Sequence, residues 1–188
     1  MSSGPIVGVR FGRVQRHTDS RGAFREVWRT SAFPPLAPDL TGVHAGHFVQ
    51  ANVSTSAPGV LRGLHYHRRQ LDYWIVLDGH AFVALVDIRP IATGGSPVVE
   101  TRELGTDDTV TIPVGVAHGF LALTQLVLLY IVTSEYDGSD EFGFRWNDPW
   151  AAVPWPRVPT TPDGMPILSE RDRGNPELTT LSDALRRG

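Results

Sequence analysis

The chain has 188 residues, of which 41% are hydrophobic and 20% charged, a balance typical of one globular domain spanning residues 1–188. It contains no cysteine, and all 17 of its lysine-plus-arginine positions are arginine, which excludes thiol nucleophiles, disulfides, Schiff-base lysines and a lysine-dependent phosphate loop. A formal net charge of −3 with dispersed arginines gives no long-range field that attracts nucleic acid or an anionic membrane.

The N-terminal residues lack the charged start and the long apolar run of a signal peptide. The longest strongly apolar run, residues 126–132, is too short to span a bilayer. We therefore expect a cytoplasmic protein that binds neither membrane nor nucleic acid.

Short β-rich runs fill the chain between frequent turn residues, because 19 glycines and 15 prolines leave little room for long helices. In chain order the expected strands are residues 6–11, 23–28, 47–53, 60–66, 73–77, 81–88, 109–112, 118–123 and 126–133. Short strands at this spacing predict an all-β sandwich or barrel.

Two of these runs carry a more specific signal. Asp78 and Gly79 lie between two apolar runs and supply the positive φ angles of a two-residue turn, so the flanking strands are expected to pair antiparallel. Residues 126–132 are apolar throughout, which predicts a strand covered on both faces.

The composition changes at residue 147, after which six prolines within about twenty residues prevent regular structure. We expect this segment to wrap over the barrel, held by Trp150 and Trp155. Residues 176–187 are expected to form a short C-terminal helix, with three leucines on one face.

The chemistry-bearing residues concentrate in two segments, 59–72 and 112–120. Residues two apart on a strand share a face, so His65 and His67 point to the same side and Arg62 to the other, unless a bulge intervenes. The histidine pair is compatible either with a functional site or with a hydrogen-bonded core.

The same segments resemble the two signature motifs of metal-binding cupins. That resemblance implies a divalent iron, manganese, nickel or zinc ion on four ligands, which would be His65, His67, Asp72 and His118. An aspartate stands where those cupins usually have glutamate.

A second resemblance covers the chain from Arg13 to Pro176. The sequence resembles the dTDP-4-dehydrorhamnose 3,5-epimerase family in segments that occur in the order of the family, at residues 19–26, 48–54, 59–66, 86–89, 112–120, 129–130, 136, 146–149 and 168–172. This family implies a cupin-type double-stranded β-helix, also called a jelly-roll barrel, with no metal or other cofactor. The implied substrate is a dTDP-4-keto-6-deoxyhexose of deoxysugar biosynthesis, such as that of rhamnose.

The implied reaction passes through an enolate, because a 4-keto group acidifies the hydrogens on C3 and C5. Inversion needs a base on one face of the sugar and an acid on the other. The resemblance assigns His65 as the base, Asp172 as its partner and Tyr130 as the acid. A carboxylate on the second ring nitrogen fixes the tautomer and supports the imidazolium.

The resemblance also implies a binding site for the nucleotide and a homodimer. Arg62 and His118 match residues that hold the diphosphate, and Tyr136 is expected to line the sugar or base pocket. The nucleotide end of the site, formed partly by a neighbouring subunit, is expected to contain Arg21, Phe24, Glu26, Gln50 and Asn52.

Two positions depart from the family pattern. His67 stands where the family commonly has glutamine, and Asp72 where it has an active-site lysine, whose charge would favour the enolate oxygen. One explanation is that Arg68 or Arg69 replaces the lysine while Asp72 positions it. Another is a divalent ion on His67, Asp72 and His118. A third is a different sugar nucleotide, inversion at one carbon only, or loss of activity.

The leading function is therefore epimerisation at C3, C5 or both of a dTDP-4-keto-6-deoxyhexose. Two alternatives stay open, namely a metal-dependent cupin oxygenase or isomerase and a non-catalytic sugar-nucleotide binder. Loss of activity after chelation would indicate the metal-dependent enzyme. Stabilisation by dTDP without turnover would indicate the non-catalytic binder.

Overall fold

The computed structural model describes residues 5–32 and 48–187. Its strands are β1 (Arg10–Arg13), β2 (Arg16–Asp19), β3 (Gly22–Arg25), β4 (Gln50–Ser56), β5 (Leu61–Tyr66), β6 (Asp72–Asp78), β7 (His80–Asp87), β8 (Val98–Gly105), β9 (Asp108–Ile112), β10 (Val116–Ala122), β11 (Leu126–Val132) and β12 (Phe142–Gly143). Its helices are the 3₁₀ turns η1 (Thr30–Ala32) and η3 (Arg89–Thr93) and the α-helices α1 (Glu170–Gly174) and α2 (Leu178–Arg187). The all-β prediction is confirmed; the expected start of a strand at His47 lies outside the described residues.

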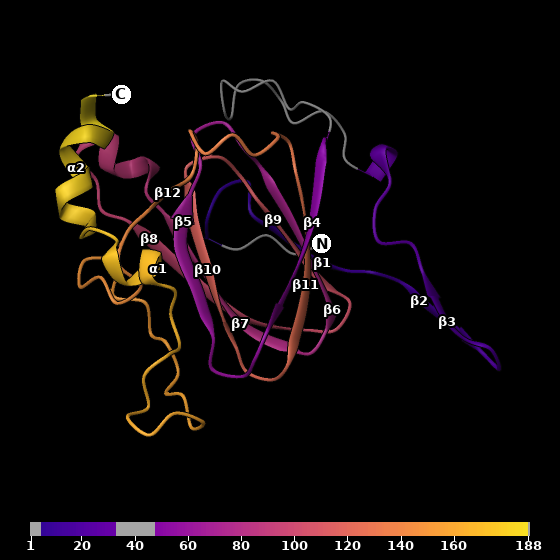
Figure 1. Cartoon of the computed structure of the whole chain (residues 1–188). Helices are drawn as coiled ribbons and strands as arrows, with labels where there is room; N and C mark the ends of the chain where they lie inside the picture. The colour runs from indigo at the N-terminus through magenta and orange to yellow at the C-terminus, as the bar shows by residue number, and fades with distance from the viewer. Residues whose placement is uncertain (1–4, 33–47, 188) are drawn as a thin grey trace.

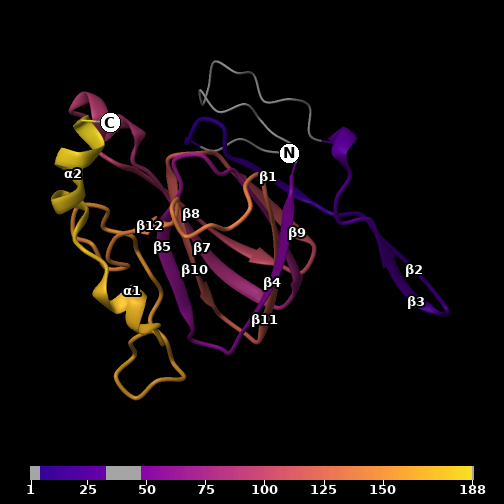
Figure 2. The ribbon, with the colours of Figure 1, turned by 45° about the horizontal axis from the view of Figure 1, so that its top comes forward.

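Two five-stranded antiparallel sheets face each other and form a barrel (Figure 1). One sheet has the order β1-β9-β6-β11-β4 and the other the order β12-β5-β10-β7-β8. The arrangement confirms the predicted cupin-type jelly roll. The third sheet, a two-stranded ribbon of β2 and β3, extends away from the barrel, as Figure 2 shows from a second direction.

The barrel interior is filled from both sheets, because alternate residues of each strand point inward. Buried residues of the interior include Trp74, Val76, Val83, Leu85, Val110, Ile112, Phe120, Leu126 and Leu128. Tyr130 packs against this cluster and is only partly buried. The core therefore ends at Tyr130, next to the polar residues described below.

The predicted hairpin at Asp78–Gly79 is wrong. β6 pairs with β9 and β11, whereas β7 pairs with β8 and β10 in the opposite sheet. Gly79 has the expected positive φ of 94°, and a Cβ there would lie 2.0 Å from the carbonyl oxygen of Gln125. The glycine thus allows a tight turn of the chain from one sheet to the other. The residues of the turn do not reveal that β6 and β7 pair with other strands and not with each other.

Strand β11 differs from the expectation of full cover on both faces. Leu126, Leu128, Ile131 and Val132 are buried, but the residues between them are only partly covered. Tyr130 belongs to this second group, which leaves its side chain accessible. The strand therefore contributes both to the core and to a cavity wall.

The C-terminal segment covers the outer face of the β5–β10–β7 sheet. Helix α2 confirms the predicted helix, and Leu178, Leu181 and Leu185 pack with Trp150 and Trp155 against residues of that face. Helix α1, which the sequence reading missed, brings residues 170–174 next to β5. Within the described chain, no helix is long and apolar enough to cross a membrane.

Candidate active site

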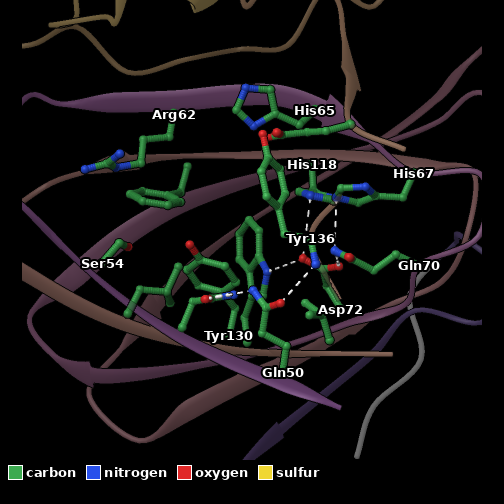
Figure 3. Close-up of a pocket in the computed structure, with 16 residues that line it drawn as sticks. Gln50, Ser54, Arg62, His65, His67, Gln70, Asp72, His118, Tyr130 and Tyr136 are labelled. Atoms are coloured by element: carbon green, nitrogen blue, oxygen red, sulfur yellow. Dashed lines mark hydrogen bonds and ion pairs between the residues drawn. The ribbon is translucent and has the colours of Figure 1, made fainter. Parts of the chain in front are cut away.

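A cavity of about 370 Å³ opens between the two sheets beside Tyr130 (Figure 3). Its lining residues are Gln50, Asn52, Ser54, Arg62, His65, His67, Gln70, Asp72, Trp74, His118, Phe120, Leu128, Tyr130, Val132, Tyr136 and Glu141. In Figure 3, Arg62 and Ser54 lie on one side of the cavity, and His67, Gln70 and Asp72 on the other. The cavity thus has a cationic side and a side of hydrogen-bond acceptors.

A bulge in β5 places Arg62 and His65 in the same cavity. In the pairing of β10 with β5, His118 lies opposite His65 and Phe120 lies opposite Arg62. The two β10 residues are two positions apart, whereas their β5 partners are three positions apart. The extra residue reverses the parity that a regular strand would give. Close packing shapes this bend, since a Cβ on Gly63 would lie 2.6 Å from the Cα of Gly119.

His65 and Asp172 form a direct pair. The Nε2 atom of His65 lies 2.6 Å from Oδ1 of Asp172, and the hydroxyl of Ser169 donates to Oδ2 of the same carboxylate at 2.9 Å. Burial alone raises the pKa of Asp172, but the hydrogen bond and charge of His65, with the Ser169 hydroxyl, hold it below its ordinary value. The carboxylate is therefore ionised and fixes the ring orientation of His65.

The pair depends on a short helix that brings distant parts of the chain together. Ser169 is the N-cap of α1, and its hydroxyl also accepts a hydrogen bond from the backbone N–H of Asp172 at 3.1 Å. The cap therefore holds the backbone and the carboxylate of Asp172 at once. Ser169 was missing from the sequence-based site, although its place three residues before Asp172 is a capping signal.

Tyr130 reaches the cavity from β11, between Asn52 of β4 and Trp74 of β6. Burial raises the pKa of its phenol above the ordinary value, against the lowering effect of Arg62. The hydroxyl is therefore protonated at neutral pH, as an acid must be. His65 and Tyr130 thus enter one cavity from the two facing sheets.

Gln50 and Asn52 line the cavity and tie it to the loop that carries Tyr136. The Gln50 amide donates to Oδ1 of Asn52 at 3.0 Å and accepts from the backbone N–H of Tyr136 at 2.9 Å. The Tyr136 side chain is exposed at the cavity mouth. All three predicted residues thus share the cavity with His65, and their roles toward a ligand stay predictions.

His67, Asp72 and His118 form a compact cluster at the other side of the cavity. One ligand atom from each lies within 4.8 Å of the others. His65 is outside this cluster, because its Nε2 pairs with Asp172, so the four-ligand metal set expected from sequence is reduced to three.

His118 is buried within this cluster, edge-on to Trp74 at a ring-centroid distance of 5.1 Å. Burial lowers its pKa to about 4, against the opposing charge of Asp72. The ring is therefore neutral at pH 7 and offers no positive charge to a diphosphate. Its predicted contact with a diphosphate is supported by resemblance alone.

Arg68 and Arg69 do not take the place of the missing lysine charge in this structure. The guanidinium of Arg68 stacks over Phe142, and that of Arg69 binds the hydroxyl of Ser139. Asp72 instead accepts hydrogen bonds from Gln70 and Trp74. The expectation that Asp72 positions an arginine is therefore wrong.

The remaining predicted residues lie away from this cavity. Arg21 and Phe24 belong to the β2–β3 ribbon and its turn, and Glu26 follows it directly. The Phe24 side chain is 70% exposed, and Glu26 pairs with Arg29. The chain does not bring these three residues to its own cavity.

Seven lining residues were not predicted from the sequence; Trp74, Phe120, Leu128 and Val132 are apolar or aromatic, and Ser54, Gln70 and Glu141 are hydrophilic. The Ser54 hydroxyl is buried without a hydrogen-bond partner, which leaves it free for a ligand. Ser54 continues the period of two that Gln50 and Asn52 set on β4, whereas Gln70 and Glu141 join the site only when segments distant in sequence meet.

A barrel cavity that receives a histidine–carboxylate pair and a protonated tyrosine from facing sheets defines an acid–base enzyme of the cupin fold. The family model described as dTDP-4-dehydrorhamnose 3,5-epimerase matches residues 3–180. The chain belongs to this family, whose members are isomerases of sugar nucleotides.

Individual relatives show the extent of the similarity. A dTDP-4-dehydrorhamnose 3,5-epimerase of Pseudomonas aeruginosa is 37% identical over 159 residues, which cover 82% of this chain and 82% of that protein. The solved RmlC epimerase of Mycobacterium tuberculosis has a TM-score of 0.80 and 32% identity, with 97% and 90% of the two chains covered. A 3,5-epimerase of Legionella pneumophila, solved with dTDP-4-keto-L-rhamnose, has a TM-score of 0.79 and 30% identity, with 97% and 94% covered.

Proposed function

We propose that this chain inverts C3, C5 or both carbons of a dTDP-4-keto-6-deoxyhexose through an enolate intermediate. The observation that carries the proposal is the pair of His65 and Asp172 at a cavity that also receives Tyr130. Family membership supports the substrate class. The structure supports the acid–base roles, because the two groups belong to facing sheets.

The proposed base is Nδ1 of His65. Because the Nε2–H group donates to Asp172, the ring lone pair that can accept a proton lies on Nδ1. Abstraction at a carbon next to the ketone leaves an imidazolium, which the ionised Asp172 stabilises, and an enolate. Tyr130 then returns a proton to the opposite face, which inverts the carbon.

The proposed diphosphate contact is Arg62. Its guanidinium is held by the hydroxyl of Ser56 at 3.1 Å and by the carbonyl oxygen of Thr55 at 3.3 Å. Both bonds fix the side chain at the cavity edge while other N–H groups stay available for phosphate oxygens. Arg62 thus sets the direction in which the sugar enters toward His65.

We also propose that the active form is a homodimer in which the β2–β3 ribbon completes the site of the neighbouring subunit. The ribbon extends from the barrel (Figure 1). The side chain of Phe24 on it is exposed. Mixing two weakly active variants, His65→Asn and Phe24→Ala, tests this. A mixed dimer joins an intact His65 site to an intact ribbon and regains activity; no recovery contradicts the shared site.

The decisive experiment follows proton NMR of dTDP-4-keto-6-deoxyglucose with the enzyme in D₂O, with deuterium entry at C3 and C5 measured separately. Exchange at either carbon establishes enolate chemistry at that carbon, and the configuration of the product there shows whether the carbon is inverted. The His65→Asn variant is expected to lose at least about 100-fold in exchange rate, the usual contribution of a positioned base. His80→Asn is the matched control, because His80 is exposed and does not line the cavity.

The same experiment separates the proposal from a non-catalytic role. Absence of exchange at both carbons, with dTDP still raising the thermal midpoint, would show a sugar-nucleotide binder and contradict the epimerase. Near-normal exchange in His65→Asn would instead contradict only the assignment of the base.

A further inference from the structure

The cluster of His67, Asp72 and His118 has the geometry of a metal site. Asp72 begins β6 and His118 lies within β10, while His67 directly follows β5, so three segments supply one ligand atom each. Asp72 and His118 are 4% and 5% exposed, and His67 is half-buried at the cavity. The three residues are therefore brought together by the barrel and not by a single flexible loop.

Both histidines are fixed in the tautomer that leaves Nε2 as an acceptor. The Nδ1 atom of His67 bonds the backbone carbonyl of Asp140, and that of His118 bonds the carbonyl of Val116 at 3.2 Å. A carbonyl oxygen only accepts, so each Nδ1 carries the proton. Metal-binding histidines are oriented in this manner by carbonyl groups behind them.

The acceptor atoms of the three residues face one another across the cluster. The Nε2 atom of His118 lies 3.8 Å from Oδ2 of Asp72, which is too long for a hydrogen bond. The amide nitrogen of Gln70 reaches Oδ1 of Asp72 at 2.7 Å and Nε2 of His67 at 3.2 Å. The two N–H groups of this amide thus serve one acceptor each on His67 and Asp72, and a single cation would bind both of these atoms and Nε2 of His118.

We propose that Nε2 of His67, a carboxylate oxygen of Asp72 and Nε2 of His118 bind one divalent transition-metal ion. Two imidazoles and a carboxylate suit zinc, iron, cobalt, nickel or manganese better than calcium or magnesium. Rotation of the Gln70 amide by half a turn replaces its nitrogen with Oε1, a further oxygen ligand. The Trp74 indole, which donates to Oδ2 of Asp72 at 3.1 Å, orients the carboxylate.

Binding of the ion does not depend on the proposed epimerase activity. The effect of the ion on catalysis does rest on the proposed epimerase activity, because the cation would offset the negative charge of Asp72 at the wall of the proposed enolate site. Among the described lining residues Arg62 is the single arginine, and the chain contains no lysine. A developing enolate oxygen needs positive charge nearby, which the ion would supply.

The test is a titration of the chelator-treated protein with Co²⁺, without sugar nucleotide. We expect one ion per chain, visible d–d absorption and a rise in the thermal unfolding midpoint. His67→Gln is expected to weaken binding by about tenfold or more, since one ligand of three is lost. His65→Asn and His80→Ala are the controls and are expected to bind Co²⁺ as the wild type does, because neither residue belongs to the cluster.

The outcomes separate the site from the function. Absence of stoichiometric binding to the wild type, or binding by His67→Gln equal to that of the wild type, overturns the metal site. Asp72→Asn adds a second test at a buried ligand, with circular dichroism to verify its fold. Co²⁺ binding without deuterium exchange at the sugar would contradict the epimerase while leaving the metal site intact.

Discussion

His65 and Asp172 are 107 positions apart in sequence, yet the ring Nε2 of one lies 2.6 Å from the carboxylate of the other. The wrapping of the C-terminal segment over the β5–β10–β7 sheet produces this contact, because it delivers α1 to the strand that carries His65. The proline-rich stretch and its tryptophan anchors thus position the carboxylate that pairs with His65, the proposed base. Stability of the C-terminal segment and activity are therefore coupled.

Asp172→Asn is expected to lower the turnover rate by about 100-fold to 10,000-fold, because the neutral amide no longer stabilises the imidazolium. Initial rates across pH, with circular dichroism as a check of folding, measure the effect. Ser169→Ala is the matched comparison, since it removes the bonds of the hydroxyl to the carboxylate and to the backbone N–H of Asp172 but keeps the charge. Its loss should be much smaller; equal losses in two folded variants would mean that the position of Asp172 matters and its charge does not.

Tyr130→Phe is expected to separate the removal of the proton from its return. Deuterium exchange at the acidified carbon should continue, while the inverted product falls by about 100-fold, because the acid on the opposite face is lost. NMR quantifies both signals in one sample. Tyr66→Phe, which removes a buried phenol outside the cavity, is expected to retain both activities. Inversion by Tyr130→Phe at the normal rate would show that another acid operates.

Gly63→Ala is expected to destabilise the chain by about 1–3 kcal/mol, the usual cost of overpacking. The new Cβ would meet the backbone of Gly119 at 2.6 Å, and the φ of 127° disfavours a side chain. Gly22→Ala is a close control, because its φ is 133° and nothing lies within 4 Å of the added Cβ. Urea unfolding compares the two; equal losses would mean that backbone strain, and not the close approach, matters at Gly63.

The fold was largely accessible from the sequence because most strands are β-rich runs bounded by turn residues, whether they alternate in burial, as β4 does, or are buried along their whole length, as β10 is. Three strands were not predicted: β2 is exposed along its whole length, β8 is exposed or half-buried at all but one position, and β12 has only two residues. Pairing partners were harder to predict. The turn at Gly79 specifies a positive φ, but it does not specify strand partners. β6 and β7 belong to different sheets because they pair with β11 and β10, which lie elsewhere in the chain.

The residues of the candidate site could be predicted only in part from the sequence, for a related reason. Resemblance supplied His65 and Tyr130, which line the cavity, and Asp172, which pairs with His65; their catalytic roles stay predictions. Strand parity left the face of Arg62 dependent on a bulge, and the bulge that brings it to the cavity depends on the packing of Gly63 against β10. Gln70 was missed altogether, since its amide matters only where it lies between His67 and Asp72.

The ion pairs of Asp107 predict how stability depends on pH. Asp107 is buried and accepts hydrogen bonds from Arg16 and Arg25, which link the start of the β2–β3 ribbon and its end to the β8–β9 turn. The hydrogen bond from Arg16 is the main cause that lowers the pKa of Asp107, with the charges of both arginines adding to it. Deprotonation is therefore more favourable in the folded chain than in the unfolded chain.

A lowered pKa means that this stabilisation is fully present above the ordinary value of 3.8 and is lost as pH falls through the folded value. Asp107→Asn should therefore be less stable than the wild type at pH 7, and the difference in unfolding free energy should shrink below about pH 4. Asparagine is the suitable substitute because it tolerates the φ of 75° at this position. Urea unfolding at a series of pH values measures the difference; a gap that stays constant down to pH 2 would show that the ionised carboxylate contributes nothing.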